Sequence, residues 1–195
     1  MYKADVLRGR IWKRIWHLLK ILEMKDEYTC LHCKNTAQYS MAFAKELKLS
    51  NDQINDLHIG GCLHDIGKLF LPTDILQKPT ALTTNECKHV KNHVLYGLNI
   101  VEIYKLPPIA INCIKYHHER WDGLGYPFQL TGNDTPLEGR ILQITDAFSA
   151  MTVKRIYREP LSLNNSLSEL EQNSGTQFDP ELVNIFVNII KRRKL

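Results

Sequence analysis

The sequence predicts an all-α protein built as a single helical bundle domain, and three observations lead to this prediction. Apolar residues recur with the helical period of 3.6, capping signatures mark several helix starts, and strand-like alternation is hard to find. With 195 residues, 44% of them hydrophobic, the chain can also bury a sizeable core. We expect an additional N-terminal amphipathic helix in residues 1–25 and one domain in residues 26–195.

The first predicted helix covers residues 5–24. One apolar stripe runs along it, widened by Trp12 and Trp16, and formed by Ile11, Ile15, Leu18, Leu19 and Leu22. Its flank is basic, so a helix that lies on a membrane surface or binds a partner is an alternative. Packing on its own domain or on a second subunit is the favoured interpretation.

Four more helices are predicted in the middle of the chain. A helix that follows Asp26 carries His32, and a helix capped by Ser50 and Gln53 runs through His64 and Asp65. A capping box in residues 83–86 opens the next helix, which carries His93. A short helix from about residue 109 delivers His117 and His118 at its C-terminal end, before a loop rich in glycine and proline.

Three further helices are predicted in the last third. Thr135, Pro136 and Glu138 supply an N-cap, a first-turn proline and a capping box for a helix that carries Asp146. Asn164 or Asn165 starts a brief helix that ends at Gly175, and residues 179–180 cap the last one.

Charge and hydropathy exclude several classes of protein. The formal net charge of +4 suits an anionic small ligand but is too weak to indicate binding of a nucleic acid polymer. No apolar run approaches the roughly 20 residues that a transmembrane helix needs. The N-terminus lacks a signal-peptide pattern, because charged residues interrupt its apolar positions. We therefore expect a cytoplasmic protein without a transmembrane segment.

Five cysteines, an odd number, favour reduced thiols over a disulfide framework. Cys30 and Cys33 form a C-x-x-C pair around His32, but no second pair follows. A zinc knuckle or redox motif is the alternative here, and ordinary buried thiols are the favoured interpretation.

Side chains of the types that bind divalent metals recur along the chain, namely His32, His64, Asp65, His93, His117, His118 and Asp146. Adjacent helical residues point about 100° apart, so His64 and Asp65 can share a target only between their two directions. Two metals roughly 3.5–4 Å apart suit this arrangement, with Asp65 bridging them. Lys68, one helical turn after His64, would add a positive charge. Asp146 lies in an apolar segment and needs a partner, for which a metal is the obvious choice.

The ordered motifs of residues 26–187 resemble the HD-GYP family, a branch of the HD phosphohydrolase superfamily. The resemblance rests on Leu63 to Lys68, Pro72, residues 75–79 and 82–83, His93, His117 to Pro127, residues 136–137 and 140–141, Asp146 and residues 175–180. It implies an HD-type helical domain with a Gly-Tyr-Pro loop that hydrolyses cyclic di-GMP to linear pGpG, GMP or both.

The family pattern also implies roles for individual residues. The seven residues above would bind metal, with Asp65 and Lys68 catalytic, and Lys68, Arg155 and Arg158 would face substrate phosphates. Tyr126 either stacks on a guanine or braces its loop. Tyr28 stands where some members carry a glutamate that holds a third metal, so we expect two divalent cations. Fe or Mn is favoured, with Ni, Co or Zn also compatible.

In this interpretation a hydroxide that bridges the two metals attacks the phosphodiester. A non-catalytic cyclic-dinucleotide sensor or protein-interaction module is the main alternative, and the complete ligand set argues against it. An HD hydrolase of mononucleotides is a third reading, which the Gly-Tyr-Pro loop disfavours. A protein partner at that loop and a homodimer are further expectations.

Overall fold

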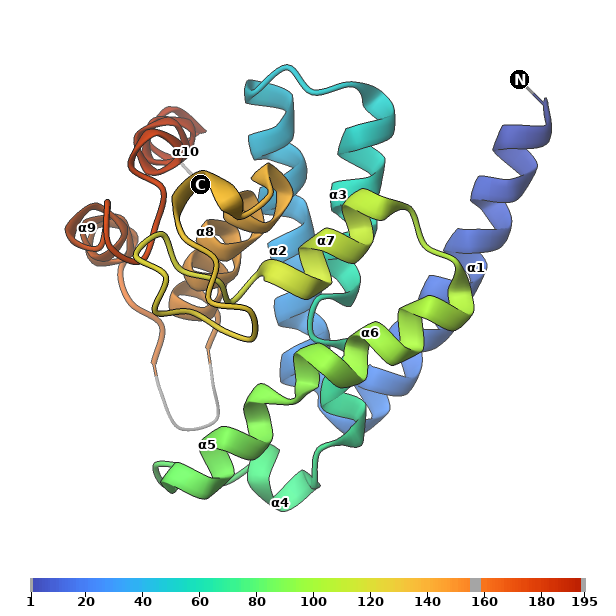
Figure 1. Ribbon diagram of the computed structural model, residues 1–195, viewed down its shortest axis with the longest axis horizontal. Helices are drawn as coiled ribbons and strands as arrows, with labels where there is room; N and C mark the ends of the chain where they lie inside the picture. Colours follow the sequence, from blue (N-terminus) through green and yellow to red (C-terminus); the bar gives the residue numbers. More distant parts are fainter. Residues whose placement is uncertain (1, 155–158, 194–195) are drawn as a thin grey trace.

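The computed structural model describes residues 2–154 and 159–193, which are mostly helical and confirm the all-α prediction (Figure 1). Within these ranges the only β-type pairing is an isolated bridge between Ser174 and Phe178. The elements are α1 (Tyr2–Lys25), α2 (Glu27–Glu46), α3 (Asn51–Leu63), the 3-10 helix η1 (Ile66–Phe70), α4 (Thr73–Leu76), α5 (Thr84–Lys91), α6 (His93–Tyr104), α7 (Pro108–Tyr116), the 3-10 helix η2 (Gly132–Asp134), α8 (Leu137–Thr152), α9 (Leu163–Gln172) and α10 (Pro180–Arg193).

Helices α2 and α3 form the centre of the bundle. Helix α7 packs on α3 and α8 packs on α2, while α9 and α10 close the far side of α8 (Figure 1). Two apolar cores result. Phe43, Phe148 and Phe186 meet in the core between α2, α8 and α10. The second core lies between α1, α2, α3, α6 and α7 and includes Leu63 and Ile114.

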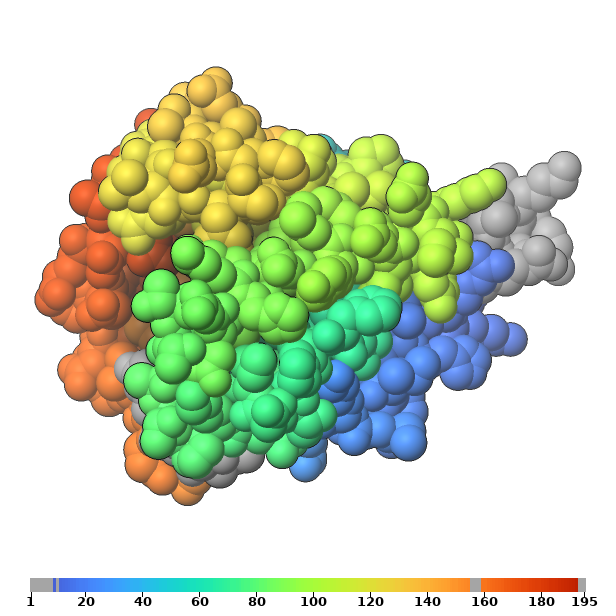
Figure 2. Space-filling model, turned by 60° about the horizontal axis from the view of Figure 1, so that its bottom comes forward, coloured from blue at the N-terminus to red at the C-terminus, as the bar shows by residue number. Residues whose placement is uncertain are grey.

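The C-terminal part of α1 belongs to this second core. Its stripe of Ile15, Leu18, Leu19 and Leu22 is buried against the domain, whereas Trp16 is 61% exposed. The N-terminal end of α1 projects from the body (Figure 1). In the space-filling view, the α5–α6 segment lies between α1 and the C-terminal helices (Figure 2). The helix therefore packs on its own domain, and its separation at residue 25 as a distinct unit stays a prediction.

The prediction that a continuous helix carries His64 and Asp65 is wrong. Helix α3 ends at Leu63, His64 is its C-cap residue, and Asp65 leaves the α-helical path with φ −98° and ψ 8°. The close approach of η1 to α6 explains the turn, because a Cβ on Gly67 would overlap the carbonyl of His93. Lys68 consequently reaches Asp65 through a 3-10 turn and does not lie one α-helical turn beyond His64.

Two predicted helix starts are confirmed, although one of these helices ends early. Thr83 accepts from the backbone N–H of Glu86 in a capping box, but the helix stops at Lys91 and a new one begins at His93. Asp179 accepts from two N–H groups in the first turn of α10, as expected.

Two predicted N-caps are wrong by one to three positions. Pro136 occupies the N-cap of α8, and the buried hydroxyl of Thr135, one residue too early, lacks a hydrogen-bond partner. Ser162 caps α9 by accepting from the N–H of Asn165, where Asn164 or Asn165 was expected as the cap. Serine and asparagine are comparable caps, so the pattern alone could not choose between neighbouring candidates.

No helix in residues 2–154 and 159–193 has the combination of length and apolar character that crossing a bilayer requires.

Candidate metal centre

The seven predicted ligands converge at one place, where the N-terminal half of α2, the ends of α3 and α7, the start of α6 and the middle of α8 meet. They form two groups whose ligand atoms lie within 4.8 Å of one another. One group comprises His32, His64 and Asp146, and the other comprises Asp65, His93, His117 and His118. Residues far apart in the sequence thus form a single cluster of imidazoles and carboxylates.

Three of the histidines are oriented by the ends of helices. Nδ1 of each ring donates to the carbonyl three residues earlier, at 2.7–2.9 Å, in the pairs His64–Gly61, His93–Val90 and His117–Ile114. Carbonyls in the last turn of a helix lack backbone partners, so they are available to accept. Because a carbonyl can only accept, a proton lies on Nδ1 of each ring, and Nε2 faces the cluster.

His32 is oriented in the same way by a side chain. The hydroxyl of Ser149 donates to the His32 carbonyl at 3.3 Å and lies 2.9 Å from His32 Nδ1, which leaves that nitrogen as the donor. His32 Nε2 then faces the Asp146 carboxylate, 2.7 Å from Oδ1. Ser149 therefore orients the His32 ring through its Nδ1 atom. Sequence analysis did not identify this contact.

Asp65 lies between the two groups. Its Oδ1 is 3.3 Å from Nε2 of His93, and its Oδ2 is 3.5 Å from Nε2 of His64. The Oδ2 atom also accepts from Lys68 Nζ at 2.6 Å. Each carboxylate oxygen thus faces a different set of imidazoles, which is the arrangement that a carboxylate needs to bridge two cations.

Two features of the cluster fit divalent cations. His64 Nε2 is fully buried and has no hydrogen-bond partner. The Nε2 atoms of His93 and His117 are 3.2 Å apart, although both are acceptors, and two nitrogens bound about 2.1 Å from one ion lie at roughly this spacing. Acceptors that face one another in a buried site repel unless a cation or proton lies between them.

Electrostatics keep several ligands in the state that binds metal. Burial lowers the pKa of His93 to about 4 and that of His118 to about 3, so both rings are neutral at pH 7. Burial alone would raise the pKa of Asp65, but the charges of Lys68 and His64 hold it well below its usual value. Neutral imidazoles and ionised carboxylates are the forms that metals require.

The Gly-Tyr-Pro loop closes one side of the cluster. The Tyr126 ring stacks on the His118 ring with centroids 4.6 Å apart. The backbone N–H of Tyr126 donates to the His118 carbonyl at 3.1 Å. A Cβ on Gly125 would overlap the backbone of Arg120, so only glycine permits this approach. The buried Glu119 carboxylate accepts from the N–H groups of Phe128 and Leu130 and so fixes the far end of the loop.

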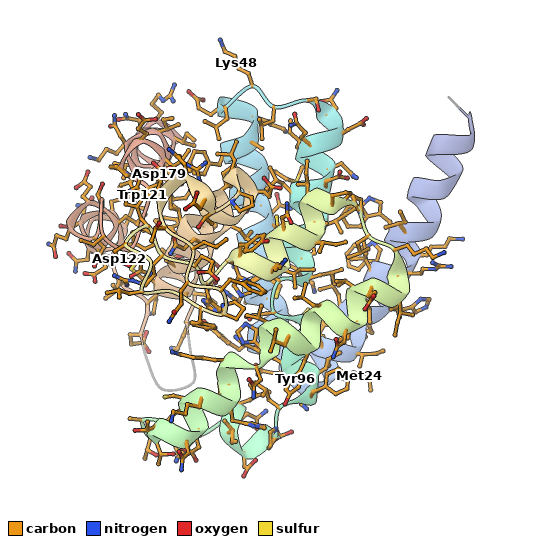
Figure 3. All side chains as sticks on the ribbon, in the orientation of Figure 1. Met24, Lys48, Tyr96, Trp121, Asp122 and Asp179 are labelled. Carbon is orange, nitrogen blue, oxygen red and sulfur yellow. The ribbon has the colours of Figure 1, made fainter. Side chains whose placement is uncertain are left out.

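The start of this loop is attached to the segment before α10. The N–H groups of Trp121 and Asp122 donate to the carbonyls of Gln177 and Thr176, at 2.9 and 2.8 Å. Figure 3 shows Trp121 and Asp122 on the same side of the molecule as Asp179. Asp122 also pairs with Arg120 through two hydrogen bonds. Asp122 therefore shapes the loop and does not orient a ligand imidazole.

A pocket of about 340 Å³ opens beside the loop and reaches the cluster. Its lining includes cationic and amide side chains that the sequence-based predictions did not name: Lys91, Arg120, Gln143 and Gln177. Lys91 Nζ lies 4.8 Å from the centre of the Tyr126 ring. Positive charge beside a metal cluster favours an anionic substrate.

Two other predictions concern cysteine and arginine. The thiol of Cys33 lies within 4.8 Å of ligand atoms of His64 and Asp65, although Cys33 was expected to be an ordinary buried thiol. Cys30 and Cys33 are both free and buried in the core. Arg155 and Arg158, the predicted phosphate contacts, lie outside the described residues.

Comparisons with known proteins agree with this geometry. A model of the HD domain family matches residues 17–182. A cyclic di-GMP phosphodiesterase of Thermotoga maritima is 34% identical over 183 residues, which cover 91% of this chain and 50% of that protein. The 3'3'-cGAMP-specific phosphodiesterase 2 of Vibrio cholerae is also 34% identical over 183 residues, covering 93% of this chain and 35% of that protein.

The fold is shared with a solved structure as well. The cyclic GMP-AMP specific phosphodiesterase V-cGAP3 of V. cholerae superposes with a TM-score of 0.70 at 18% identity, over 91% of this chain and 48% of that one. The chain spans about half or less of the length of these proteins. It belongs to the HD domain family, and the resemblance to its HD-GYP branch is confirmed.

Proposed function

We propose that this chain is a metal-dependent phosphodiesterase that hydrolyses cyclic di-GMP to linear pGpG, GMP or both. The position of Asp65 supports the proposal most directly, because its two oxygens face two separate groups of imidazoles. The relatives named above as phosphodiesterases of cyclic dinucleotides support the substrate class. A 3'3'-cGAMP-specific relative at the same identity makes the mixed dinucleotide the natural comparison substrate.

The proposed centre holds two divalent cations, with Fe or Mn favoured. His32, His64 and Asp146 would hold one, His93, His117 and His118 the other, and Asp65 both. Such a pair lowers the pKa of coordinated water toward neutrality and stabilises negative charge on a phosphoryl oxygen. Imidazole and carboxylate ligands suit several first-row metals, so ligand type does not select one.

The surrounding residues supply positioning and charge. The side chain of Lys68 is 21% exposed and its ammonium group lies beside Asp65, so Lys68 can face a phosphate that approaches the centre. There it would stabilise the charge that develops on the phosphoryl oxygens during hydrolysis. Tyr126, stacked on His118, and Lys91 line the adjacent pocket and would contact the nucleotide.

Metal analysis combined with product chromatography tests the proposal. The purified protein is analysed for bound metal, loaded with Mn²⁺ or Fe²⁺ under anaerobic conditions, and incubated with cyclic di-GMP and 3'3'-cGAMP. We expect two metals per chain and release of linear dinucleotide or GMP. Tight binding of cyclic di-GMP without turnover by the fully loaded protein would instead identify a sensor and overturn the proposal.

A further inference from the structure

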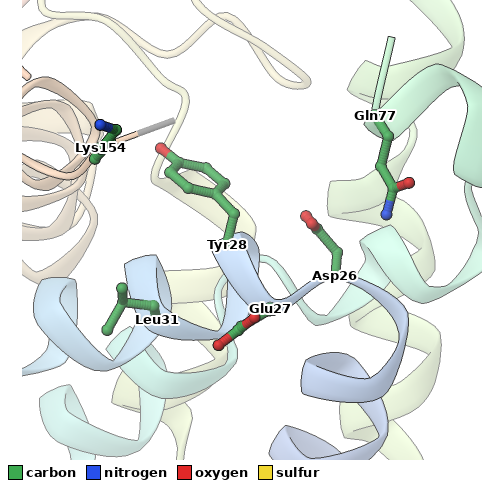
Figure 4. A pocket seen from close by; sticks show the side chains of 6 residues that line it. All are labelled: Asp26, Glu27, Tyr28, Leu31, Gln77 and Lys154. Atoms are coloured by element: carbon green, nitrogen blue, oxygen red, sulfur yellow. The ribbon is translucent and has the colours of Figure 1, made fainter. Parts of the chain in front are cut away.

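A second pocket, of about 360 Å³, shares no lining residue with the pocket beside the Gly-Tyr-Pro loop. It is formed by the N-cap and first turns of α2, the residue after α4 and the second residue after α8. It is lined by Asp26, Glu27, Tyr28, Leu31, Gln77 and Lys154. In Figure 4 the Asp26 carboxylate and the Gln77 amide lie across a gap from each other, and the Tyr28 ring points toward Lys154. The volume falls in the range of small-molecule sites, about 300–1,000 Å³.

The wall of this pocket is continuous with the metal cluster. The rings of Tyr28 and His32 are nearly parallel, with an interplanar angle of 5° and centroids 6.0 Å apart. His32 Nε2 in turn lies 2.7 Å from Asp146. A ligand that places a phosphate at the cluster therefore has its neighbouring group within reach of Tyr28.

The lining has the chemistry of a site for a purine base. Tyr28 presents a flat aromatic face and the half-exposed Leu31 an apolar one, and bases stack on such surfaces with little regard to sequence. The Asp26 carboxylate, held by hydrogen bonds from the backbone N–H and the hydroxyl of Thr29, can only accept when it is ionised. Guanine presents N–H donors on its Watson–Crick edge, whereas adenine presents an unprotonated ring nitrogen there.

We propose that this pocket binds one base of the cyclic dinucleotide and selects guanine over adenine, with Tyr28 stacking on the base and Asp26 accepting from its N–H groups. Gln77, which offers both a donor and an acceptor, completes the polar edge. This inference rests on the proposed function and adds to it the location and identity of a base-recognition site. It also gives Tyr28 a role of its own.

Binding and hydrolysis are measured separately to test the site. Binding uses a phosphorothioate analogue of cyclic di-GMP and of cyclic di-AMP, titrated calorimetrically into metal-loaded protein, so that it does not depend on turnover. Hydrolysis uses cyclic di-GMP and the base-free diester bis(p-nitrophenyl) phosphate. Metal content is determined for every variant, because Tyr28 contacts the ring of His32.

Removing the ring is expected to weaken binding selectively. Tyr28→Ala should bind the cyclic di-GMP analogue about fivefold to a hundredfold more weakly than wild type. Tyr28→Phe keeps the stacking surface and should restore most of that affinity. The loss of kcat/KM should be about tenfold larger for cyclic di-GMP than for the base-free diester.

Asp26→Asn tests the choice of base without removing the helix cap, because asparagine caps as well as aspartate. It should reduce the preference for the guanine analogue over the adenine analogue by about tenfold. Unchanged binding by Tyr28→Ala, or equal losses on both substrates, would overturn the site while leaving the hydrolase assignment intact. Binding that depends on Tyr28 without hydrolysis would overturn the hydrolase assignment and keep the base site. A wild-type protein that binds neither analogue would overturn both.

Discussion

His93 and His117 face each other through their Nε2 atoms across 3.2 Å, while Nδ1 of each ring donates to a main-chain carbonyl. Helix α6 begins at His93, and α7 ends just before His117. The backbone thus directs two lone pairs at one point in the interior. A cation at that point turns a repulsive contact into a stabilising one.

We expect Mn²⁺ to stabilise the folded protein. At a free concentration 100 times its Kd, one bound ion contributes about 2.7 kcal/mol, which is several degrees in Tm for a domain of this size. Scanning calorimetry of chelator-treated protein, with and without added Mn²⁺, measures the shift. His117→Ala should reduce it. Identical melting curves with and without the ion would contradict a metal centre at these residues.

Metal-free protein should lose stability as the pH falls from about 6.5 toward 4. Burial lowers the pKa of His93 to about 4 and of His118 to about 3, and also depresses that of His117. In the unfolded chain histidine titrates near 6.5, so the unfolded state binds more protons in this range. Each excess proton lowers the free energy of unfolding by about 1.4 kcal/mol per pH unit.

One histidine acts in the opposite sense. Burial disfavours the charged form of His64, but Cys33 and Asp65 outweigh it and raise its pKa, so protonation of His64 favours the folded state. Burial also lowers the pKa of His58, so four depressed histidines stand against one raised histidine, and the net slope keeps its sign. Urea unfolding of chelated protein between pH 7 and pH 4.5 measures it, and His118→Gln should make the slope shallower. Stability that does not change over this range would count against the buried neutral imidazoles.

Lys68→Met should slow catalysis while leaving the metals bound. Removing one preorganised group that stabilises charge in a transition state commonly costs about 10²–10³ in kcat. Lys68 Nζ lies 2.6 Å from Asp65, but the cations would still neutralise that carboxylate. Steady-state kinetics on cyclic di-GMP and metal analysis of the same preparation are the measurements. A variant that loses its metals would show that Lys68 holds Asp65 in place and does not act on the phosphate.

Gly67→Ala should impair the metal centre, although glycine at this position carries no ligand. A Cβ there would overlap the carbonyl of His93 and lie 2.5 Å from the N atom of Gly97, so α6 must shift and move the His93 ring. We expect reduced metal content and a loss of about 1–3 kcal/mol in the free energy of unfolding.

Gly9→Ala is the matched control, because nothing lies within 4 Å of a Cβ at that position in α1. Alanine there should be neutral or stabilise the helix by up to about 1 kcal/mol. Equal effects of the two substitutions on metal content would rule out a specific role for the contact between η1 and α6.

Ligand identity could be predicted from the sequence because metal chemistry depends on residue type. Imidazoles and carboxylates at His32, His64, Asp65, His93 and Asp146 have few other reasons to recur in one chain. Helical periodicity and capping signatures likewise depend on neighbours in the chain, so the starts of α2, α7 and α10 were predicted close to where they are observed. The exact cap residues were predicted less well, because Pro136 takes the place expected for Thr135 and Ser162 the place expected for Asn164 or Asn165.

The path of the chain at Asp65 could not be foreseen from local pattern. A helix was expected to continue there, but the close contact between Gly67 and His93 joins segments 26 residues apart and ends α3 early. The residues around the Tyr28 ring could not be predicted for the same reason. Its ring lies parallel to that of His32 on its own helix and lines a pocket together with Gln77 from another segment, which no periodicity links.

By itself, the sequence determined the all-α class, the helix starts marked by capping boxes, and the set of groups able to bind divalent cations, since each depends on side-chain chemistry or on contacts within a few residues. Tertiary structure alone decided that Asp65 turns an oxygen toward each group of imidazoles, that Ser149 and three carbonyls set the histidine tautomers, and that a pocket opens at Tyr28. These features depend on how α2, α3, α6, α7 and α8 pack, and packing is a property of surfaces that meet only after the chain has folded.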